Sequence, residues 1–149
     1  MKTVSDLLGR KGTEVWSVSP EDTVYDALRV MSAKNVGAVL VLEDGDLVGI
    51  FSERDYARSV VLAGKASRGT SVGEVMHRDV LYIRPDHTVE DCMVLMTEKH
   101  LRHLPVFDDG RLAGLISIGD VVNSIISKQD FKIKQLENWI TAQDEKFRY

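Results

Sequence analysis

An internal duplication limits the possible folds of this chain more than any other feature of its sequence. Residues 15–57 align with residues 80–122 at a constant offset of 65 and without a gap, and 14 of the 43 aligned pairs are identical. The identities favour residue types that turn the backbone or cap helices: Pro20 and Pro85, Thr23 and Thr88, Asp26 and Asp91, Asp44 and Asp109, Gly45 and Gly110, Gly49 and Gly114, Ser52 and Ser117, Asp55 and Asp120. Such a repeat indicates one supersecondary unit that occurs twice.

The first copy predicts a β-α-β-β-α unit. Residues 15–18 form a short strand pattern that ends near a proline. Residues 24–31 carry apolar side chains at i, i+3, i+4 and i+7, the spacing of an amphipathic helix. Residues 39–42 and 47–51 are apolar runs of strand length, and residues 55–62 predict a second helix. The second copy predicts the same elements 65 residues later.

Local residue types support these boundaries. Thr23 and Asp26 resemble a capping box at the start of the first helix, with aspartate in place of the usual glutamate. The dipeptide Asp44-Gly45 predicts a tight hairpin turn between the two strands. Gly64 follows the second helix at the position where a left-handed cap is favoured.

One unit of this size leaves an apolar face open, and two units can cover each other. The predicted fold class is therefore α/β (α+β), with two β-α-β-β-α repeats packed as a pseudo-twofold pair and flanking N- and C-terminal helices. A weaker similarity between residues 4–8 and 72–76 predicts a lead-in helix for each repeat. We expect repeat 1 with its lead-in helix in residues 1–66, repeat 2 in 67–128 and a C-terminal amphipathic helix in 129–149.

The predicted C-terminal helix has two interpretations. Its apolar residues lie close to helical spacing with charges between them: Ile133, Leu136, Trp139, Ile140 and Phe147. The apolar face either packs on its own domain or extends an interface with a partner or a second copy.

Composition narrows the function classes. The chain has 149 residues, 44% hydrophobic and 28% charged, as in ordinary globular proteins. A net charge of −4 gives no general attraction to nucleic acid or anionic membrane, and no apolar run approaches the ~18 residues of a membrane span. The chain shows no leader pattern, and its single cysteine, Cys92, cannot form an internal disulfide, so we expect a cytoplasmic location.

Metal and thiol chemistry have little support. His100 and His103 lie three residues apart, but they bridge the end of a predicted helix and the start of a strand rather than sharing one helical face. We expect no metal. Cys92 lies on the inner face of its predicted helix, as expected for a buried, unreactive thiol.

The segments 49–55 and 114–120 are the strongest candidates for ligand binding. Each runs from a strand through a turn into a helix, and each carries a serine and an aspartate three residues apart. Free backbone amides, a hydroxyl and a carboxylate at such a turn can bind the phosphate and ribose of a nucleotide. The same residues can also simply cap the helix, and the spacing alone leaves both interpretations open.

The duplicated pattern Gly-apolar-apolar-Ser-x-x-Asp, together with Arg102-His103-Leu104-Pro105-Val106, resembles a tandem pair of cystathionine-β-synthase (CBS) domains, also called a Bateman module. The resemblance covers residues 1–127, and the chain resembles small stand-alone bacterial signal-transduction proteins of this kind. It implies a non-catalytic regulatory sensor that binds AMP, ATP, NAD or NADH between its repeats and signals to an unknown protein partner. It also implies a homodimer. The alternative is a dimeric interaction module with vestigial pockets.

The resemblance implies two clefts and assigns residues to each. The first comprises Asp120, Ser117, Leu115, Arg102 and His103, opposite Lys11, Trp16, Val36 and Gly37. The second comprises Asp55, Ser52 and Ile50, with Arg54 in support, opposite Leu81, Tyr82 and Leu101. The aspartates are assigned to ribose hydroxyls and Arg102 and His103 to phosphates. Because the residues aligned with Arg102 and His103 are the uncharged Gly37 and Ala38, the Asp120 cleft is predicted to be the better phosphate site. The Asp55 cleft is predicted to prefer a less charged or differently placed ligand, or to stay empty. Arg54, Arg102 and Lys11 could together neutralise a pyrophosphate.

Overall fold

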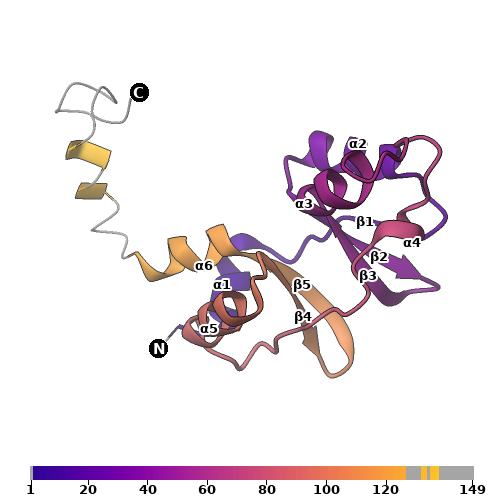
Figure 1. Ribbon diagram of the computed structural model, residues 1–149. Helices are drawn as coiled ribbons and strands as arrows, with labels where there is room; N and C mark the ends of the chain where they lie inside the picture. Colours follow the sequence, from indigo (N-terminus) through magenta and orange to yellow (C-terminus); the bar gives the residue numbers. More distant parts are fainter. Residues whose placement is uncertain (1, 127–131, 134, 138–149) are drawn as a thin grey trace.

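The computed structural model describes residues 2–126, 132–133 and 135–137 (Figure 1). The first repeat contains β1 (Ser17–Val18), α2 (Val24–Lys34), β2 (Ala38–Glu43), β3 (Asp46–Ser52), α3 (Glu53–Asp55) and η1 (Tyr56–Val61). The second contains α5 (Val89–Lys99), β4 (His103–Asp108), β5 (Arg111–Ser117) and α6 (Ile118–Ile125). Helix α1 (Val4–Lys11) precedes the first repeat, and α4 (Val72–Val75) precedes the second. The predicted fold class is confirmed, and each repeat forms one lobe around its own hairpin.

The two hairpins confirm the predicted turns. Strands β2 and β3 pair antiparallel, as do β4 and β5, and each pair has one register irregularity at the same aligned position. At the first turn Asp44 and Gly45 have φ angles of 52° and 85°, and at the second Asp109 and Gly110 have 51° and 75°. Two consecutive left-handed residues fit a turn whose twist matches that of the strands, which explains the Asp-Gly pair in both copies.

The helix boundaries also follow the sequence. Thr23 caps α2 by accepting a hydrogen bond from the Asp26 N–H at 3.1 Å, while the Asp26 carboxylate accepts the Thr23 N–H at 3.3 Å. Thr88 and Asp91 form the same capping box on α5. Both helices end in a left-handed residue, Asn35 and its aligned counterpart His100.

The first strand of the second repeat is shorter than predicted. In the first repeat the Leu40 N–H donates to the carbonyl of Trp16 at 3.0 Å, which supports β1. The residue aligned with Leu40 is Pro105, which has no N–H to donate. Residues 80–83 therefore keep only an isolated bridge, from Ile83 to Val106.

The helix predicted for residues 55–62 is irregular. One turn of α3 leads into η1, a π-helix in which the Leu62 N–H donates to the Ala57 carbonyl at 3.0 Å. Gly64 then adopts a left-handed φ of 73°, as predicted for the residue after this helix. Its counterpart α6 is a regular α-helix of 8 residues.

The lead-in helices pack on the opposite repeats, which corrects the prediction that each belongs to its own. Helix α1 lies beside α5 and α6 (Figure 1), and its Val4 N–H donates to the His87 carbonyl at 2.8 Å. Helix α4 lies against the first repeat, where the Val72 N–H donates to the Asp22 carbonyl at 2.8 Å. The exchange places Leu8 of α1 and Met76, the residue after α4, in the core of the other copy.

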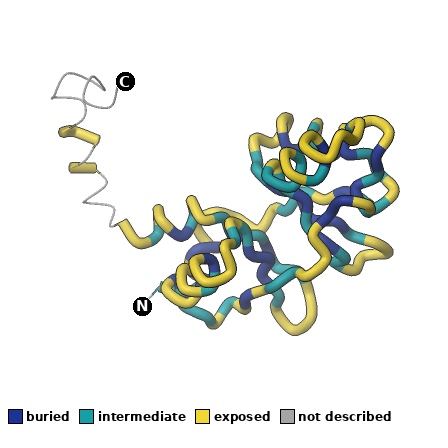
Figure 2. Tube along the Cα trace, viewed as in Figure 1, coloured by how far each residue is buried: buried dark blue, intermediate teal, exposed yellow. Residues whose placement is uncertain are grey.

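Each lobe has its own buried core (Figure 2). In the first, fully buried Val39, Val41 and Phe51 of the hairpin pack against α2 and α4. In the second, Leu104 and Ile116 pack against α1, α5 and α6. Because each core includes a helix from the other half of the sequence, we expect neither repeat to be stable alone.

The C-terminal prediction is described only in part. Residues 132–133 and 135–137 are helical, and both Ile133 and Leu136 are exposed. The rest of the predicted helix, including Trp139, Ile140 and Phe147, lies outside the described residues. Among the described helices, none combines the length and apolar character needed to span a membrane.

Candidate functional site

Both Ser-x-x-Asp motifs lie where the second strand of a hairpin enters a helix. Ser52 ends β3, and its N–H donates to Asp55 Oδ2 at 2.9 Å while its hydroxyl accepts the Asp55 N–H at 3.2 Å. Ser117 and Asp120 repeat this arrangement at 2.8 Å and 3.2 Å. Ser52 and Ser117 therefore cap their helices, as one of the two interpretations predicted. In each motif, the second carboxylate oxygen of the aspartate is still available for another partner.

The Asp55 motif borders a cavity of about 530 Å³ between the two repeats. Its lining from the first repeat is Gly37, Ile50, Ser52, Glu53, Arg54, Asp55 and Arg58. His77 comes from the connection between the repeats, and Lys99, His100, Leu101, Arg102 and His103 come from the second repeat. The volume lies within the range of small-molecule sites, about 300–1,000 Å³.

Four cations converge on this cavity without forming an ion pair. Arg54 and Arg58 come from the first repeat, and Lys99 and Arg102 from the second. None of their side chains has a hydrogen bond or ion pair within the described residues. The cavity also contains the carboxylates of Glu53 and Asp55, so its permanent charges still sum to a positive value. In a chain of net charge −4, this local excess favours an anionic ligand.

The position of Arg102 differs from the sequence-based assignment. Arg102 and His103 were predicted to serve the Asp120 cleft of their own repeat, but both line the cavity that contains Asp55. The reason is topological, because the connection from α5 to β4 runs along the boundary between the repeats. The Arg102 carbonyl accepts the Ile118 N–H at 2.8 Å, which anchors this connection to the start of α6.

His103 lies at the boundary between the two motifs. Its imidazole is close to Gly37, because a Cβ atom added to Gly37 would lie 3.7 Å from Cε1 of His103. Burial lowers the pKa of His103, as do the charges of Lys11 and Arg102, and the Asp120 carboxylate only partly opposes them. The imidazole is therefore neutral at pH 7, and it can donate or accept one hydrogen bond at each nitrogen.

The Asp120 motif has a partner that Asp55 lacks. Lys11, the last residue of α1, donates to Asp120 Oδ2 at 2.5 Å and to the Leu115 carbonyl at 2.5 Å. Burial alone would raise the pKa of Asp120, but the hydrogen bonds from Lys11 and Ser117 outweigh it and hold that pKa below its usual value. The expected proximity of Lys11 and Asp120 is found, as a direct contact between them.

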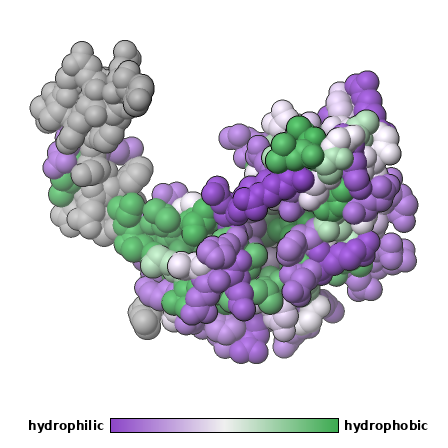
Figure 3. Space-filling view, in the orientation of Figure 1, coloured by the Kyte–Doolittle hydropathy of each residue, from purple (hydrophilic) through white to green (hydrophobic). Residues whose placement is uncertain are grey.

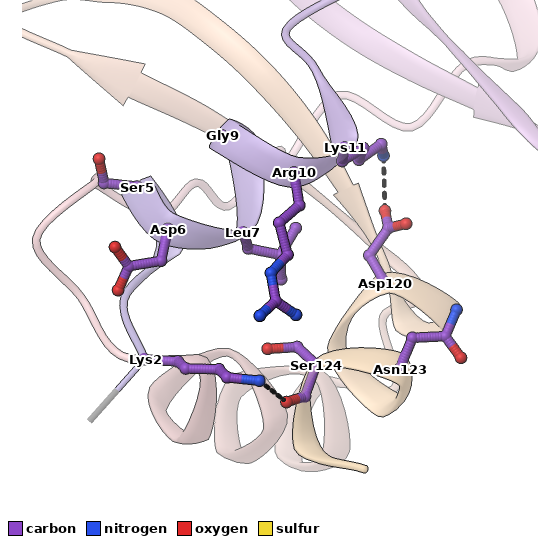
Figure 4. A pocket seen from close by; sticks show the side chains of 10 residues that line it. All are labelled: Lys2, Ser5, Asp6, Leu7, Gly9, Arg10, Lys11, Asp120, Asn123 and Ser124. Atoms are coloured by element: carbon purple, nitrogen blue, oxygen red, sulfur yellow. Dashed lines mark hydrogen bonds and ion pairs between the residues drawn. The ribbon is translucent and has the colours of Figure 1, made fainter. Parts of the chain in front are cut away.

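A second cavity, of about 680 Å³, lies between α1 and α6 (Figure 4). Arg10 extends into it, Lys11 and Asp120 meet at one side, and Lys2 donates to the Ser124 carbonyl at 2.8 Å on another. Of the predicted Asp120 cleft, only Lys11 and Asp120 line this cavity; Leu115, Ser117, Arg102 and His103 do not.

Three other predicted residues lie outside both cavities. Trp16 packs on the first core, and Lys34 lies over its ring at 4.3 Å. Val36 also packs on that core, although the neighbouring Gly37 reaches the Asp55 cavity. Tyr82 was predicted to lie in the cleft of Asp55, but it does not line the Asp55 cavity. Its side chain is 56% exposed and contacts Phe107 edge to face.

Sequence reasoning missed several lining residues. Arg58 follows Arg54 by four residues, a spacing that places two side chains on one face of a helix and could have revealed it. Lys99 precedes the left-handed residue His100, and its approach to the other repeat depends on the packing of the pair. His77 was unpredictable for the same reason; its N–H donates to the Ile50 carbonyl at 2.9 Å.

Metal and thiol chemistry gain no support. Within the described residues, no group of three or more histidine, cysteine or acidic side chains could hold a metal ion. Cys92 is buried, and burial raises the pKa of its thiol to about 11. The thiol is therefore protonated and unreactive at neutral pH.

The fold and the paired Ser-x-x-Asp motifs define a tandem regulatory module, and comparison with known families agrees. The CBS domain model matches residues 4–62 and 72–127. The chain belongs to the CBS-domain family and contains a CBS pair, which is a regulatory module.

Several relatives are of similar size. A mitochondrial CBS domain-containing protein of Arabidopsis thaliana is 36% identical over 148 residues, covering 93% of this chain and 71% of the relative. A Bacillus subtilis CBS domain-containing protein is 33% identical over 129 residues, covering 87% and 89%. A CBS-domain structure from Burkholderia ambifaria, of a candidate signal-transduction protein, is 46% identical with a TM-score of 0.83, covering 86% and 96%.

A more distant structure shares the fold. The CBS pair of a protein designated MJ0100, in complex with 5-methylthioadenosine and S-adenosylmethionine, shares 22% identity and a TM-score of 0.72 with this chain, covering 83% of it and 95% of the other.

Proposed function

We propose that this protein is a non-catalytic sensor that binds an adenine nucleotide in the Asp55 cavity and transmits occupancy to a protein partner. The observation that carries the proposal is the convergence of four cations from both repeats beside the Ser52–Asp55 motif, without an ion pair to any described residue: Arg54, Arg58, Lys99 and Arg102. The complex of a relative of the same fold with two adenosine compounds supports the adenosine part of the proposal.

Each part of the cavity suits one part of a nucleotide. The Asp55 carboxylate can accept the ribose hydroxyls through the oxygen that Ser52 does not use. The guanidinium groups of Arg54 and Arg102 suit phosphate oxygens, which they can bind in pairs. Ile50 and Leu101 supply apolar surface for the base. AMP, ATP, NAD and NADH all carry these parts, and the four cations favour ligands with more than one phosphate.

A bound nucleotide would couple the repeats because its phosphates would contact cations from both. The ligand can shift the arrangement of the repeats only by its difference in affinity for the two arrangements. We propose a reducing, cytoplasmic setting, in keeping with the protonated Cys92 thiol.

Isothermal titration with AMP, ATP, NAD, NADH and adenosine tests the proposal directly. We expect binding of nucleotides, weaker binding of adenosine and loss of both in Asp55→Ala. A ligand at one hundred times its dissociation constant should stabilise the fold by about 2.7 kcal/mol. Absence of binding and of thermal stabilisation with every compound at millimolar concentration would reject the sensor function.

A second candidate function is protein interaction with vestigial pockets. It is favoured by an apolar patch over α6, which Figure 3 shows. Exposed apolar side chains lie on α5, on α6 and just after α6: Met93, Val94, Ile118, Val122, Ile125 and Ile126. We propose that a second copy of the chain covers this surface in a homodimer. A homodimer is compatible with either function, and the titration separates the two functions, because a vestigial pocket would bind no nucleotide while the dimer persists.

A further inference from the structure

The two clefts of this CBS pair are unequal because of one side chain. We infer that Lys11 acts as a built-in occupant of the Asp120 cleft and thereby restricts nucleotide binding to the Asp55 cavity. This inference rests on the proposed function, since it concerns which of two related clefts takes the ligand.

Lys11 engages the two groups on which a nucleoside at this motif would depend. Its ammonium donates to Asp120 Oδ2, part of the carboxylate assigned to ribose hydroxyls, and to the carbonyl of Leu115, another residue of the same predicted cleft. The side chains of Lys11 and Asp120 are 32% and 23% exposed, so the ion pair is partly shielded from water. A nucleoside entering here would have to displace a charged hydrogen bond and leave the ammonium without its partners.

Within the described residues, Asp55 has no equivalent ammonium partner. Its carboxylate accepts hydrogen bonds from the N–H and the hydroxyl of Ser52, at 2.9 Å each. The Ile50 carbonyl, which corresponds to that of Leu115, accepts the backbone N–H of His77 at 2.9 Å. The carbonyl thus has a hydrogen-bond donor in both repeats. Among the described donors, only Lys11, in the second repeat, also pairs with the aspartate of the motif.

A three-residue difference between the lead-in segments explains the asymmetry. Leu8 and Met76 occupy matching places, over Gly114 and Gly49 respectively. From Leu8 to Val15 there are 7 steps along the chain, whereas from Met76 to the aligned Val80 there are 4. The extra residues continue α1 to Lys11, giving it 8 residues, while α4 has 4. This additional helical turn carries the ammonium to Asp120 (Figure 4).

A role of Lys11 as a phosphate ligand predicts the opposite effect of its removal on nucleotide binding. If Lys11 were a phosphate ligand of the Asp120 cleft, its removal would weaken binding there. If it occupies the cleft, its removal creates a site. Lys11→Met separates these roles, because methionine keeps an unbranched stem of similar length but has no ammonium to donate.

Titrations with AMP, ATP and NAD, each used separately, should compare four chains: wild type, Lys11→Met, Asp55→Ala and the double variant. We expect one nucleotide per wild-type chain, two per Lys11→Met chain, none for Asp55→Ala and one for the double variant. The double variant should bind nucleotide at least tenfold more tightly than Asp55→Ala does. Lys2→Met is the matched control, because it also removes a lysine contact to α6, from the segment just before α1, but not one to Asp120, and it should retain one nucleotide per chain.

Each other outcome decides a separate point. Two nucleotides per wild-type chain, or one per chain for both wild type and Lys11→Met, would overturn the role of Lys11 and leave the sensor function intact. No binding by wild type with one per Lys11→Met chain would support the Lys11 role and reject the Asp55 site. If none of the folded chains, checked by circular dichroism and melting, binds any of the three probes, both proposals are wrong.

Discussion

Gly114 lies directly beneath Leu8, so that a Cβ on this glycine would come within 2.7 Å of Leu8 Cδ2. Gly49 has the same relationship with Met76, at 2.5 Å from its Sδ. These glycines are identical in the two repeats because each allows the lead-in helix from the other half of the chain to approach the second hairpin strand. The exchange of helices therefore depends on the absence of a side chain at two strand positions.

The first prediction concerns this close approach. Gly114→Ala should lower the free energy of unfolding by about 1–3 kcal/mol, since the added methyl group would push Leu8 out of a filled core. Gly9→Ala is the control, because this exposed glycine in α1 has nothing within 4 Å of an added Cβ. It should raise the free energy of unfolding by about 0.5–1 kcal/mol through helix propensity. Urea unfolding measures both, and equal stability of Gly114→Ala and wild type would contradict the packing argument.

The second prediction separates phosphate from base recognition. Arg102→Ala should weaken ATP and AMP binding by about 1.5–3 kcal/mol, the range for hydrogen bonds to charged groups, discounted toward its lower end because the side chain is exposed. Adenosine binding should change little. Arg84→Ala is the control, because Arg84 is also exposed but pairs only with Asp86, away from the cavity. Equal losses for AMP and adenosine in calorimetric titrations would refute the assignment of Arg102 to phosphate.

The sequence predicted local structure better than the meeting of distant segments. Hairpin turns and helix caps depend on residues within one repeat, so the duplication served as an internal check on them. The left-handed Gly64 also depends on nearby residues, although it lies outside the duplicated segment. The exchange of α1 and α4 was not foreseen, because apolar spacing shows that Leu8 is buried but not which core receives it. The same limit affected the site. The Ser-x-x-Asp motifs were recognisable, whereas the cavity reached by Arg102 depends on how the two repeats pack.

The third prediction is a pH dependence from His103. Burial, Lys11 and Arg102 lower its pKa below the ordinary value of 6.5, so the unfolded chain binds a proton more readily than the folded protein does. Stability should therefore decrease as the pH falls through 6.5 toward the lower pKa of the folded state. His103→Gln, which cannot take up a proton, should lose less stability than wild type between about pH 7.5 and pH 5. Urea unfolding measures this at each pH. If the free energy of unfolding changes equally with pH in both chains, the prediction is wrong.

The fourth prediction concerns Cys92. Burial raises the pKa of its thiol to about 11, and the Asp91 charge adds to the increase, so little thiolate exists at pH 8. A disulfide reagent should leave the folded protein unlabelled over minutes and modify one thiol per chain after denaturation. Rapid labelling of the native protein at a rate independent of added urea would show that the thiol is accessible.

The fifth prediction identifies the surface that forms the dimer. Val94 on α5 and Val122 on α6 are 56% and 44% exposed, so Val94→Glu and Val122→Glu should fold normally yet place a charge in the proposed interface. Light scattering should show a wild-type dimer and a monomer for each variant, because burial of an unpaired carboxylate opposes association. Leu136→Glu tests the alternative that the C-terminal segment makes the contact, since Leu136 is 59% exposed. A dimer that persists in the α5 and α6 variants but dissociates in Leu136→Glu would move the interface to that segment, and a monomeric wild-type chain would reject the dimer itself.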